Sequence, residues 1–230
     1  MPEMNEQILE IRYKPNPKIL DYRGSWAEAI SYHMNLPEWR ILENRIDVFD
    51  KEDGDHAFVG FSNAGFVAHN TPTKNYFSDK TLKFFKYLFT LTGFEKTPNI
   101  VRIGVLSKYY TEFNGDFNAL KDKYTSNYLT LTDKAKKMFN AQLIDIGVPL
   151  NFVDKFGNFN TMSGPMTEEQ IHQFIQYAEN PPPVGLYFQI DYWIKPNRQV
   201  NENEILKNIQ QFTNSSWDRF EAINKLILGE

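Results

Sequence analysis

Two carboxylates within apolar runs are the residues of this chain with the strongest potential for chemistry. Asp145 and Asp191 both sit among residues typical of buried strands. A carboxylate buried in a strand must be paired or must titrate abnormally, and such groups gather at functional sites. Strand alternation offers a second interpretation, in which both side chains face water. The sequence marks Asp145 and Asp191 as candidate binding residues and leaves both interpretations open.

Histidine is the other residue type here that could bind a metal ion or transfer a proton. The chain contains His33, His56, His69 and His172. None has the His-x-x-x-His or His-x-His spacing of a metal site on one element, so a site would need carboxylates from other parts of the fold. His56 and His69 lie on neighbouring expected strands and could approach each other, either as ligands or as packing at the strand ends.

An acidic segment near residue 50 superficially resembles a calcium loop. Its acidic residues are Asp47, Asp50, Glu52, Asp53 and Asp55. The segment lacks the ligand spacing and the terminal glutamate of an EF-hand. Asp53-Gly54 between two β-type runs is instead typical of a hairpin turn. We therefore expect a solvated turn here.

Motifs for other catalytic classes are missing from the sequence. Cysteine is absent, which excludes thiolate nucleophiles, disulfides and Cys-ligated metals. No Gly-x-Ser-x-Gly elbow and no Gly-rich phosphate loop before a helix occurs. The sequence thus predicts no catalytic residue, no metal ligand and no cofactor.

Composition and charge limit the classes to which the protein can belong. The 230 residues are 41% hydrophobic and 15% aromatic, which favours sheets with helices packed on them. The net charge is −4, with 25 basic residues scattered among 29 acidic ones, so nucleic-acid binding is possible but not indicated. No run of about 18 apolar residues indicates a membrane span. The missing cysteines and the acidic, apolar-poor N-terminus favour a cytoplasmic location.

Several segments have clear secondary-structure signals. A helix is expected from Ser25 to before Pro37, a second from Ser78 to Gly93 and a third from Asn201 or Asn203 onwards. Expected strands are Gln7–Tyr13, Arg40–Phe49, His56–Phe61, Gly65–Asn70, Asn99–Thr111, Gln142–Asp154 and Gly185–Ile194. The strand from Asn99 should be central, with Gly104 marking a bulge or a helix that crosses closely over it.

These elements predict an α+β fold of mostly antiparallel sheet. The helices around 78–92 and 201–228 should pack on the sheet, the latter as a long C-terminal helix. We expect two similar modules, residues 1–112 and 113–230, that share an interface or form one domain. The order of elements in the two halves is the basis for this internal repeat.

Four short stretches carry a family likeness. They are Glu10-Ile-Arg-Tyr13, Arg102-Ile-Gly-Val-Leu-Ser-Lys-Tyr109, Phe188-Gln-Ile-Asp191 and Trp217-Asp-Arg-Phe-Glu221. The chain resembles a sporadically distributed family of uncharacterised bacterial proteins of about the same length. That family has no assigned activity, so the resemblance implies no site residue, and its Asp-x-Asp is Gln189-Ile-Asp191 here. Its patchy distribution implies a defence-associated or mobile-element neighbourhood.

The function expected from these observations is non-catalytic binding. A binding or scaffold protein that acts with a protein partner, or that self-associates, fits the aromatic-rich hairpins and terminal helix. The alternatives are a metal-dependent nucleic-acid-processing subunit that uses Asp145, Asp191 and a histidine, and a small-molecule sensor with a pocket between the modules. The candidate binding residues are Arg102, Lys108, Tyr109, Asp191 and Asp145.

Overall fold

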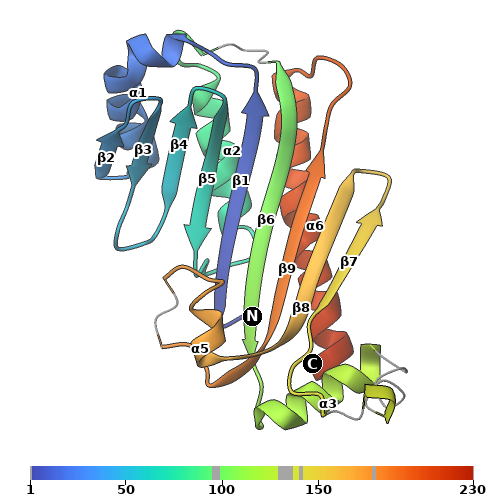
Figure 1. Ribbon diagram of the computed structural model, residues 1–230. Coiled ribbons are helices and arrows are strands. Elements are labelled where there is room, and N and C mark those ends of the chain that lie inside the picture. Colours follow the sequence, from blue (N-terminus) through green and yellow to red (C-terminus); the bar gives the residue numbers. More distant parts are fainter. Residues whose placement is uncertain (1, 95–98, 129–136, 140–141, 178–179, 230) are drawn as a thin grey trace.

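The architecture is a single antiparallel sheet with helices packed on it, seen in a computed structural model that describes residues 2–94, 99–128, 137–139, 142–177 and 180–229. In these ranges the strands are β1 (Met4–Tyr13), β2 (Glu38–Ile41), β3 (Arg45–Phe49), β4 (His56–Gly60), β5 (Asn63–His69), β6 (Ile100–Glu112), β7 (Val148–Val153), β8 (Asn158–Thr167) and β9 (Val184–Ile194). Their order across the sheet is β2-β3-β4-β5-β1-β6-β9-β8-β7 (Figure 1). The α+β class expected from the sequence is confirmed.

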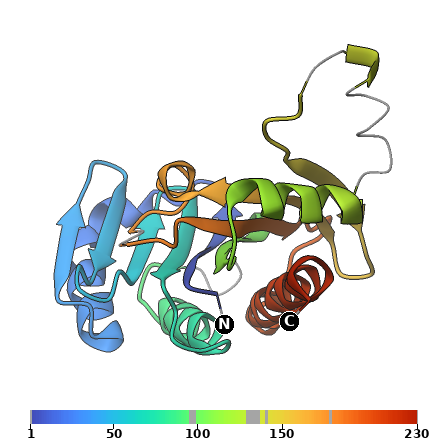
Figure 2. The same cartoon turned by 90° about the horizontal axis from the view of Figure 1, so that it is seen from below.

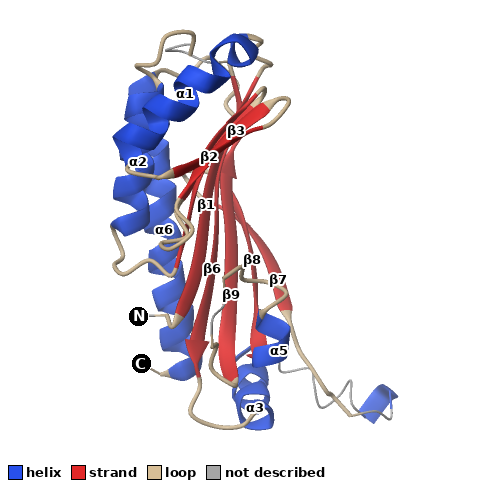
Figure 3. Cartoon of the chain, turned by 90° about the vertical axis from the view of Figure 1, so that its left-hand side faces the viewer, coloured by secondary structure: helices blue, strands red, loops and turns tan. Residues whose placement is uncertain are grey.

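Three helices cover one face of this sheet. They are α1 (Lys18–Met34), α2 (Tyr76–Leu88) and α6 (Glu202–Leu228). Figure 3 shows all three on the same side of the strands, and we call this side the helix face. The short α5 (Glu168–Ile171) lies against the opposite side, which we call the open face, and α3 (Phe117–Tyr128) lies at the end of the sheet. Figure 2 shows the strands between α2 and α6 on one side and α5 on the other.

Alternation along the central strands explains the two faces. In β1, Leu9 and Ile11 are fully buried, whereas the alternating residues Glu10 and Arg12 point to the open face, Glu10 half-buried and Arg12 exposed. In β6, Ile103 and Val105 are buried towards the helices in the same way. Side chains of successive strand residues point to opposite faces, so this pattern fixes which residues meet α2 and α6.

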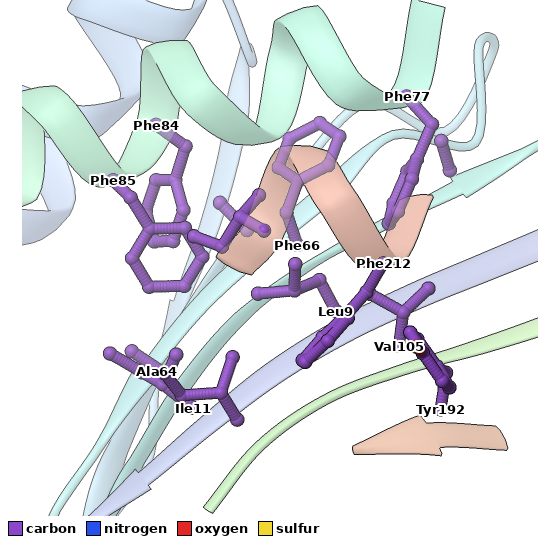
Figure 4. Close-up of a cluster of buried hydrophobic side chains, with 14 of the residues drawn as sticks. Leu9, Ile11, Ala64, Phe66, Phe77, Phe84, Phe85, Val105, Tyr192 and Phe212 are labelled. Atoms are coloured by element: carbon purple, nitrogen blue, oxygen red, sulfur yellow. The ribbon is translucent and has the colours of Figure 1, made fainter. Parts of the chain in front are cut away.

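The core fills the space between the sheet and the helices. Figure 4 shows rings from α2, α6, β5 and β9 meeting the aliphatic side chains of β1 and β6. The labelled residues are all fully buried: Leu9, Ile11, Ala64, Phe66, Phe77, Phe84, Phe85, Val105, Tyr192 and Phe212. Many of the aromatic residues of the chain pack in this layer.

The long C-terminal helix expected from the sequence is α6. It begins with a capping box, in which the Glu204 backbone N–H donates to the Asn201 side chain and the Asn201 N–H donates to the Glu204 carboxylate. It ends at Gly229 in the left-handed conformation, with φ of 84°. No described helix is long and apolar enough to cross a membrane.

The two halves of the chain meet at a pair of strands. If the halves are divided before β6, the first half runs β1, α1, the meander β2–β5 and α2, and the second runs β6, α3, the strands β7–β9 with α5 before β9, and then α6. The predicted modules 1–112 and 113–230 differ from these halves, because they assign β6 to the first module. β1 and β6 pair antiparallel at the middle of the sheet, so the other strands of each half extend outwards from them. The predicted internal repeat and the division at residue 112 stay predictions.

Several local predictions were wrong. The expected strand Arg40–Phe49 is divided into two paired strands, β2 and β3. α1 begins at Lys18, just after Pro17, and not at Ser25. Gly104 is neither a bulge nor a helix crossing, because its pairing with Glu10 and Trp193 is regular. The Arg102 guanidinium lies over Gly104 in the space where a Cβ would stand. The glycine is needed because an arginine side chain crosses the strand there.

Candidate functional site

A pocket of about 660 Å³ opens on the open face, over the strands of the first half. Its size is in the range of small-molecule sites, roughly 300–1,000 Å³. We call it the open-face pocket. It is lined by Glu6, Ile8, Arg40, Arg45, Phe49, Asp50, Lys51, Gly54, Asp55, His56, Phe58, Val67, His69, Gln176 and Tyr177.

Strand pairing sets the floor of the pocket. His56 is opposite Val67, and Val67 is opposite Ile8, so these three side chains form one row across β4, β5 and β1. Phe58 lies two residues further along β4, opposite Gly65. A Cβ on Gly65 would overlap the Phe58 ring and the Leu9 carbonyl oxygen. Glycine at this position thus lets the Phe58 ring lie against β5.

A buried carboxylate organises the basic side of the pocket. Asp47 accepts hydrogen bonds from Arg45 Nε at 2.5 Å and Arg40 Nη2 at 2.9 Å, and its Oδ1 lies 3.0 Å from His56 Nε2. Burial would raise the pKa of Asp47, but the hydrogen bonds of His56 and Arg40 and the charge of Arg45 outweigh it, so the pKa lies well below its usual range. The Arg45 guanidinium lies 4.1 Å from the centre of the Phe58 ring.

A second buried carboxylate lies at the opposite end. Glu6 Oε1 accepts from Lys108 Nζ at 2.6 Å, and its Oε2 accepts from the Gln176 backbone N–H at 3.0 Å. His69 Nδ1 donates to the Gly54 carbonyl at 2.8 Å, and His69 Nε2 lies 3.3 Å from Glu6 Oε2. Burial raises the pKa of Glu6, but contacts with His69, Lys108 and Gln176 reverse this and lower the pKa.

Asp55, at the edge of the pocket, carries its carboxylate on the helix side of the sheet, towards α2. Its Oδ2 accepts from Tyr76 OH at 2.8 Å and lies 3.1 Å from Lys80 Nζ. Its Oδ1 is buried and has no hydrogen-bond partner among the described residues. Burial raises the pKa of Asp55, against the lowering effect of Tyr76 and Lys80. A buried acceptor without a donor is costly, so this oxygen reduces the stability of the folded state.

The second half of the chain closes one side of the pocket with residues 168–177, which we call the closing segment. It begins with the capping box of Thr167 and Gln170. Lys108 Nζ donates to the Phe174 carbonyl at 2.6 Å, and Asn70 Nδ2 donates to the Tyr177 carbonyl at 3.3 Å. The Tyr177 ring lies edge-on, 4.6 Å from the His69 ring.

Apolar packing fixes the closing segment to the open face. In a small cluster separate from the main core, its side chains Ile171 and Ile175 pack with residues of four strands: Met4, Tyr110, Met166 and Tyr187. Tyr110 OH also donates to the Met166 and Pro182 carbonyls, both at 3.1 Å. The segment is therefore positioned by the central strands of both halves.

The candidate binding residues of the sequence do not form one surface. Arg102 and Lys108 lie on the open face of β6, and Arg102 Nη2 donates to both oxygens of Asp191 at 2.7 and 3.0 Å. Tyr109 lies on the helix face, fully buried, with its ring stacked 4.2 Å from that of Phe220. Lys108 reaches the closing segment, whereas Tyr109 belongs to the core.

Asp145 and Asp191 are not brought together with the histidines. Asp145 is exposed in the loop before β7, where it accepts a hydrogen bond from Gln170 Nε2 at 3.2 Å. The prediction that Asp145 lies in a strand was therefore wrong. Asp191 and His56 are separated by four strand spacings, roughly 19 Å. His56 and His69 do line the same pocket. No group of three or more His, Asp or Glu able to hold a metal ion exists among the described residues.

The prediction that the acidic turn is solvated was only partly right. Glu52 and Asp53 are exposed, but Asp47 and Asp55 are each only 1% exposed. The alternation of Arg45-Ile-Asp47 is a signal that could have placed both charges on one face. Nothing in the sequence signals that the Gln176 amide lies next to Glu6 or the Tyr177 ring next to His69.

Comparisons with known proteins add no identity to this geometry. No protein-family model matches the chain, and no curated protein is similar to it in sequence. The resemblance to the uncharacterised bacterial family stays a prediction.

Proposed function

We propose that this chain is a non-catalytic binding protein whose ligand is a small molecule held in the open-face pocket. The observation that carries the proposal is the composition of the pocket wall. Both halves contribute to it, the first through β1–β5 and the second through Gln176 and Tyr177 of the closing segment. A ligand there would contact groups from distant parts of the sequence, as in a sensor with a pocket between two modules.

The polar groups of the pocket support binding over catalysis. Asp47 and Glu6 are held by ion pairs with Arg40, Arg45 and Lys108, which fix their positions. Such fixed charges orient a ligand, whereas a nucleophile would need an adjacent base that activates it.

A pocket-filling substitution tests this proposal. Val67→Trp places an indole on the pocket floor, and Met162→Trp places one on the open face of β8, away from the pocket lining. In a thermal-shift screen of metabolites, at least one compound should stabilise the wild type and Met162→Trp but not Val67→Trp. A screen in which no compound separates the two variants would contradict the proposal.

A second candidate is association with a protein partner through the β2 edge. β2 is the outermost strand on its side of the sheet. Exposed apolar residues gather on β2 and just after it: Trp39, Ile41 and Leu42. An unpaired edge with apolar side chains favours pairing with another chain. Sedimentation and co-purification of the wild type and of Trp39→Lys test this candidate. A wild type that is always a solitary monomer would count against it.

A further inference from the structure

We propose that a groove along α6 docks an amphipathic helix of a partner protein, with apolar side chains at one end of that helix and acidic side chains at the other. The groove lies on the helix face, between α6 and the strands β7 and β8, and we call it the α6 groove. It is distinct from the open-face pocket and from the β2 edge. Three features carry the inference: an apolar half, a basic half and a width that suits one further helix.

The apolar half of the α6 groove is a hollow of about 290 Å³ near the C-terminal end of α6. Its walls are Leu150, Phe152 and Phe159 of β7 and β8 on one side and Ala222, Ile223 and Leu226 of α6 on the other. Phe152 is 45% exposed and Leu226 is 55% exposed, so large apolar side chains face water at its rim. Exposed apolar groups around a hollow are typical of interaction sites, and apolar side chains of a docked helix enter such grooves.

The basic half is a hollow of about 400 Å³ beside the first turns of α6. Four charged residues line it: Lys155, Arg198, Glu204 and Lys207. Arg198 is paired with Glu204, whereas the exposed Lys155 and Lys207 have no ion-pair partner within the described part of the chain. Two positive charges therefore remain for an acidic partner, and complementary charge favours such a partner over a basic one.

The two halves lie on the same side of α6. Within each half, the α6 residues that line the groove follow at intervals of three or four, which places them on one helix face: Glu204, Asn208 and Gln211 in the basic half, and Arg219, Ala222 and Leu226 in the apolar half. Lys207 and Ala222 are 15 residues apart, roughly 22 Å along the helix. Between them, Arg219 Nη2 donates to Asp154 Oδ2 at 2.6 Å, so the charge of this arginine is already offset.

The width of the α6 groove suits one further helix. α6 packs on β6 and β9, and β8 and β7 extend the sheet beyond these strands by two strand spacings, roughly 10 Å (Figure 1). Helices packed side by side have axes about 8–10 Å apart. α3 lies at the C-terminal end of α6, where Lys123 Nζ donates to the Leu228 carbonyl at 2.7 Å. A docked helix would therefore run alongside α6, from α3 towards the basic half.

The long helices of the chain itself are already used. α1, α2 and α6 each bury their apolar side chains in the core. A second copy therefore offers no such helix with a free apolar side, and the occupant has to come from another protein.

Fluorescence anisotropy on the full chain tests the inference with three labelled helical peptides of about 20 residues, long enough to reach both halves of the groove. The first peptide carries leucines on one face of one half and glutamates on the same face of the other half. The second has lysines in place of the glutamates, and the third has alanines in place of the leucines. The first peptide should bind about tenfold or more tightly than either of the others, and higher ionic strength should weaken its binding.

Two sets of variants place the bound peptide in the groove. Leu226→Glu should weaken the first peptide about tenfold or more. Leu20→Glu is the matched control, because Leu20 is 45% exposed on α1 and lies outside the groove lining. It should leave binding unchanged.

The charge reversal Lys155→Glu with Lys207→Glu should invert the preference, so that the lysine peptide binds more tightly than the glutamate peptide. The same reversal at Lys14 and Lys18, two exposed lysines outside the groove lining, should keep the preference of the wild type. A preference that does not change with Lys155 and Lys207 would refute the basic half of the groove.

Other outcomes overturn the inference as a whole. It fails if no peptide binds, if all three bind equally, or if Leu226→Glu binds the first peptide as tightly as wild type does. A wild-type dimer that Leu226→Glu dissociates in sedimentation would show that a second copy fills the groove instead. Dodecyl phosphate that binds wild type and not Leu226→Glu, with no preference among the peptides, would assign the groove to a lipid. Circular dichroism of each variant confirms that a lost signal is not a lost fold.

Discussion

The carboxylate of Glu6 lies 2.6 Å from the ammonium of Lys108, across the strand pair at which the two halves of the chain meet. Each residue has a second role. Glu6 accepts from the Gln176 backbone, and Lys108 donates to the Phe174 carbonyl. This one ion pair thus joins β1, β6 and the closing segment.

Lys108→Met should destabilise the protein by about 3 kcal/mol, because it leaves the buried Glu6 carboxylate without its cation. Urea unfolding measures the change. Arg12→Met, which breaks an ion pair whose arginine is 56% exposed, should change stability by no more than about 1 kcal/mol. Equal effects of the two substitutions would show that the Glu6–Lys108 pair is no stronger than a surface pair.

Asp47→Asn should lower stability most at neutral pH. The pKa of Asp47 is lowered from 3.8 by its partners, so the ionised form stabilises the folded state above that pH and loses this effect as the pH falls further. The difference in unfolding free energy between wild type and Asp47→Asn should therefore shrink below about pH 4. A difference that stays constant from neutral to acidic pH would contradict the ion cluster around Asp47.

The stability of Asp55→Asn relative to wild type should depend on pH in the opposite direction. The pKa of Asp55 is raised from 3.8, mainly by burial, so ionisation of Asp55 reduces the stability of wild type as the pH rises through and above that value. The variant lacks this loss, and its stability relative to wild type should increase from acidic to neutral pH. Unfolding curves across this interval provide the measurement, and a relative stability that falls with pH would disprove the assignment.

Gly65→Ala should destabilise the sheet by about 1–3 kcal/mol, because the added Cβ overlaps the Phe58 ring and the Leu9 carbonyl oxygen. The same substitution at Gly24 in α1 meets no atom within 4 Å and should stabilise the helix by about 0.5–1 kcal/mol. The same Gly→Ala change should therefore shift the melting temperature in opposite directions at the two positions. Movement in the same direction would refute the packing of Phe58 against β5.

Tyr109 should matter for folding and not for binding. Its ring is fully buried against Phe220 and Trp217, and Gln7 Nε2 donates to its hydroxyl at 3.3 Å. Tyr109→Ala should cost about 3–5 kcal/mol, and Tyr109→Phe about 1 kcal/mol. If Tyr109→Phe keeps its fold but no longer binds a pocket ligand, Tyr109 contributes to binding as well as to the core, and this prediction is wrong.

The strong strands and the terminal helix could be predicted from the sequence because their signals are local. The expected strand Gly185–Ile194 corresponds to β9, Val184–Ile194, and the expected strand from Asn99 corresponds to β6. The start of α1 was missed because Lys18–Arg23 contains a single fully buried residue, Ile19, and so lacks the apolar spacing of a helix.

The pocket could not be predicted because its contacts join positions far apart in the chain. Glu6 and Gln176 are separated by 170 residues, and no periodicity links them. The acidic residues near position 50 were interpreted as solvated because the partners that bury them, Arg40 for Asp47 and Tyr76 for Asp55, lie on other elements. Strand pairing joins Arg40 to Asp47, and the packing of α2 on the sheet joins Tyr76 to Asp55.

The central position of β1 has a consequence for synthesis of the chain. β1 pairs with β5 on one side and with β6 on the other, and β6 begins 87 residues after β1 ends at Tyr13, at Ile100. While the ribosome makes the first half, the β6 side of β1 is an open edge of about ten residues. Two nascent copies could pair there and exchange their second halves, so domain-swapped dimers are the misassembly that we expect during expression.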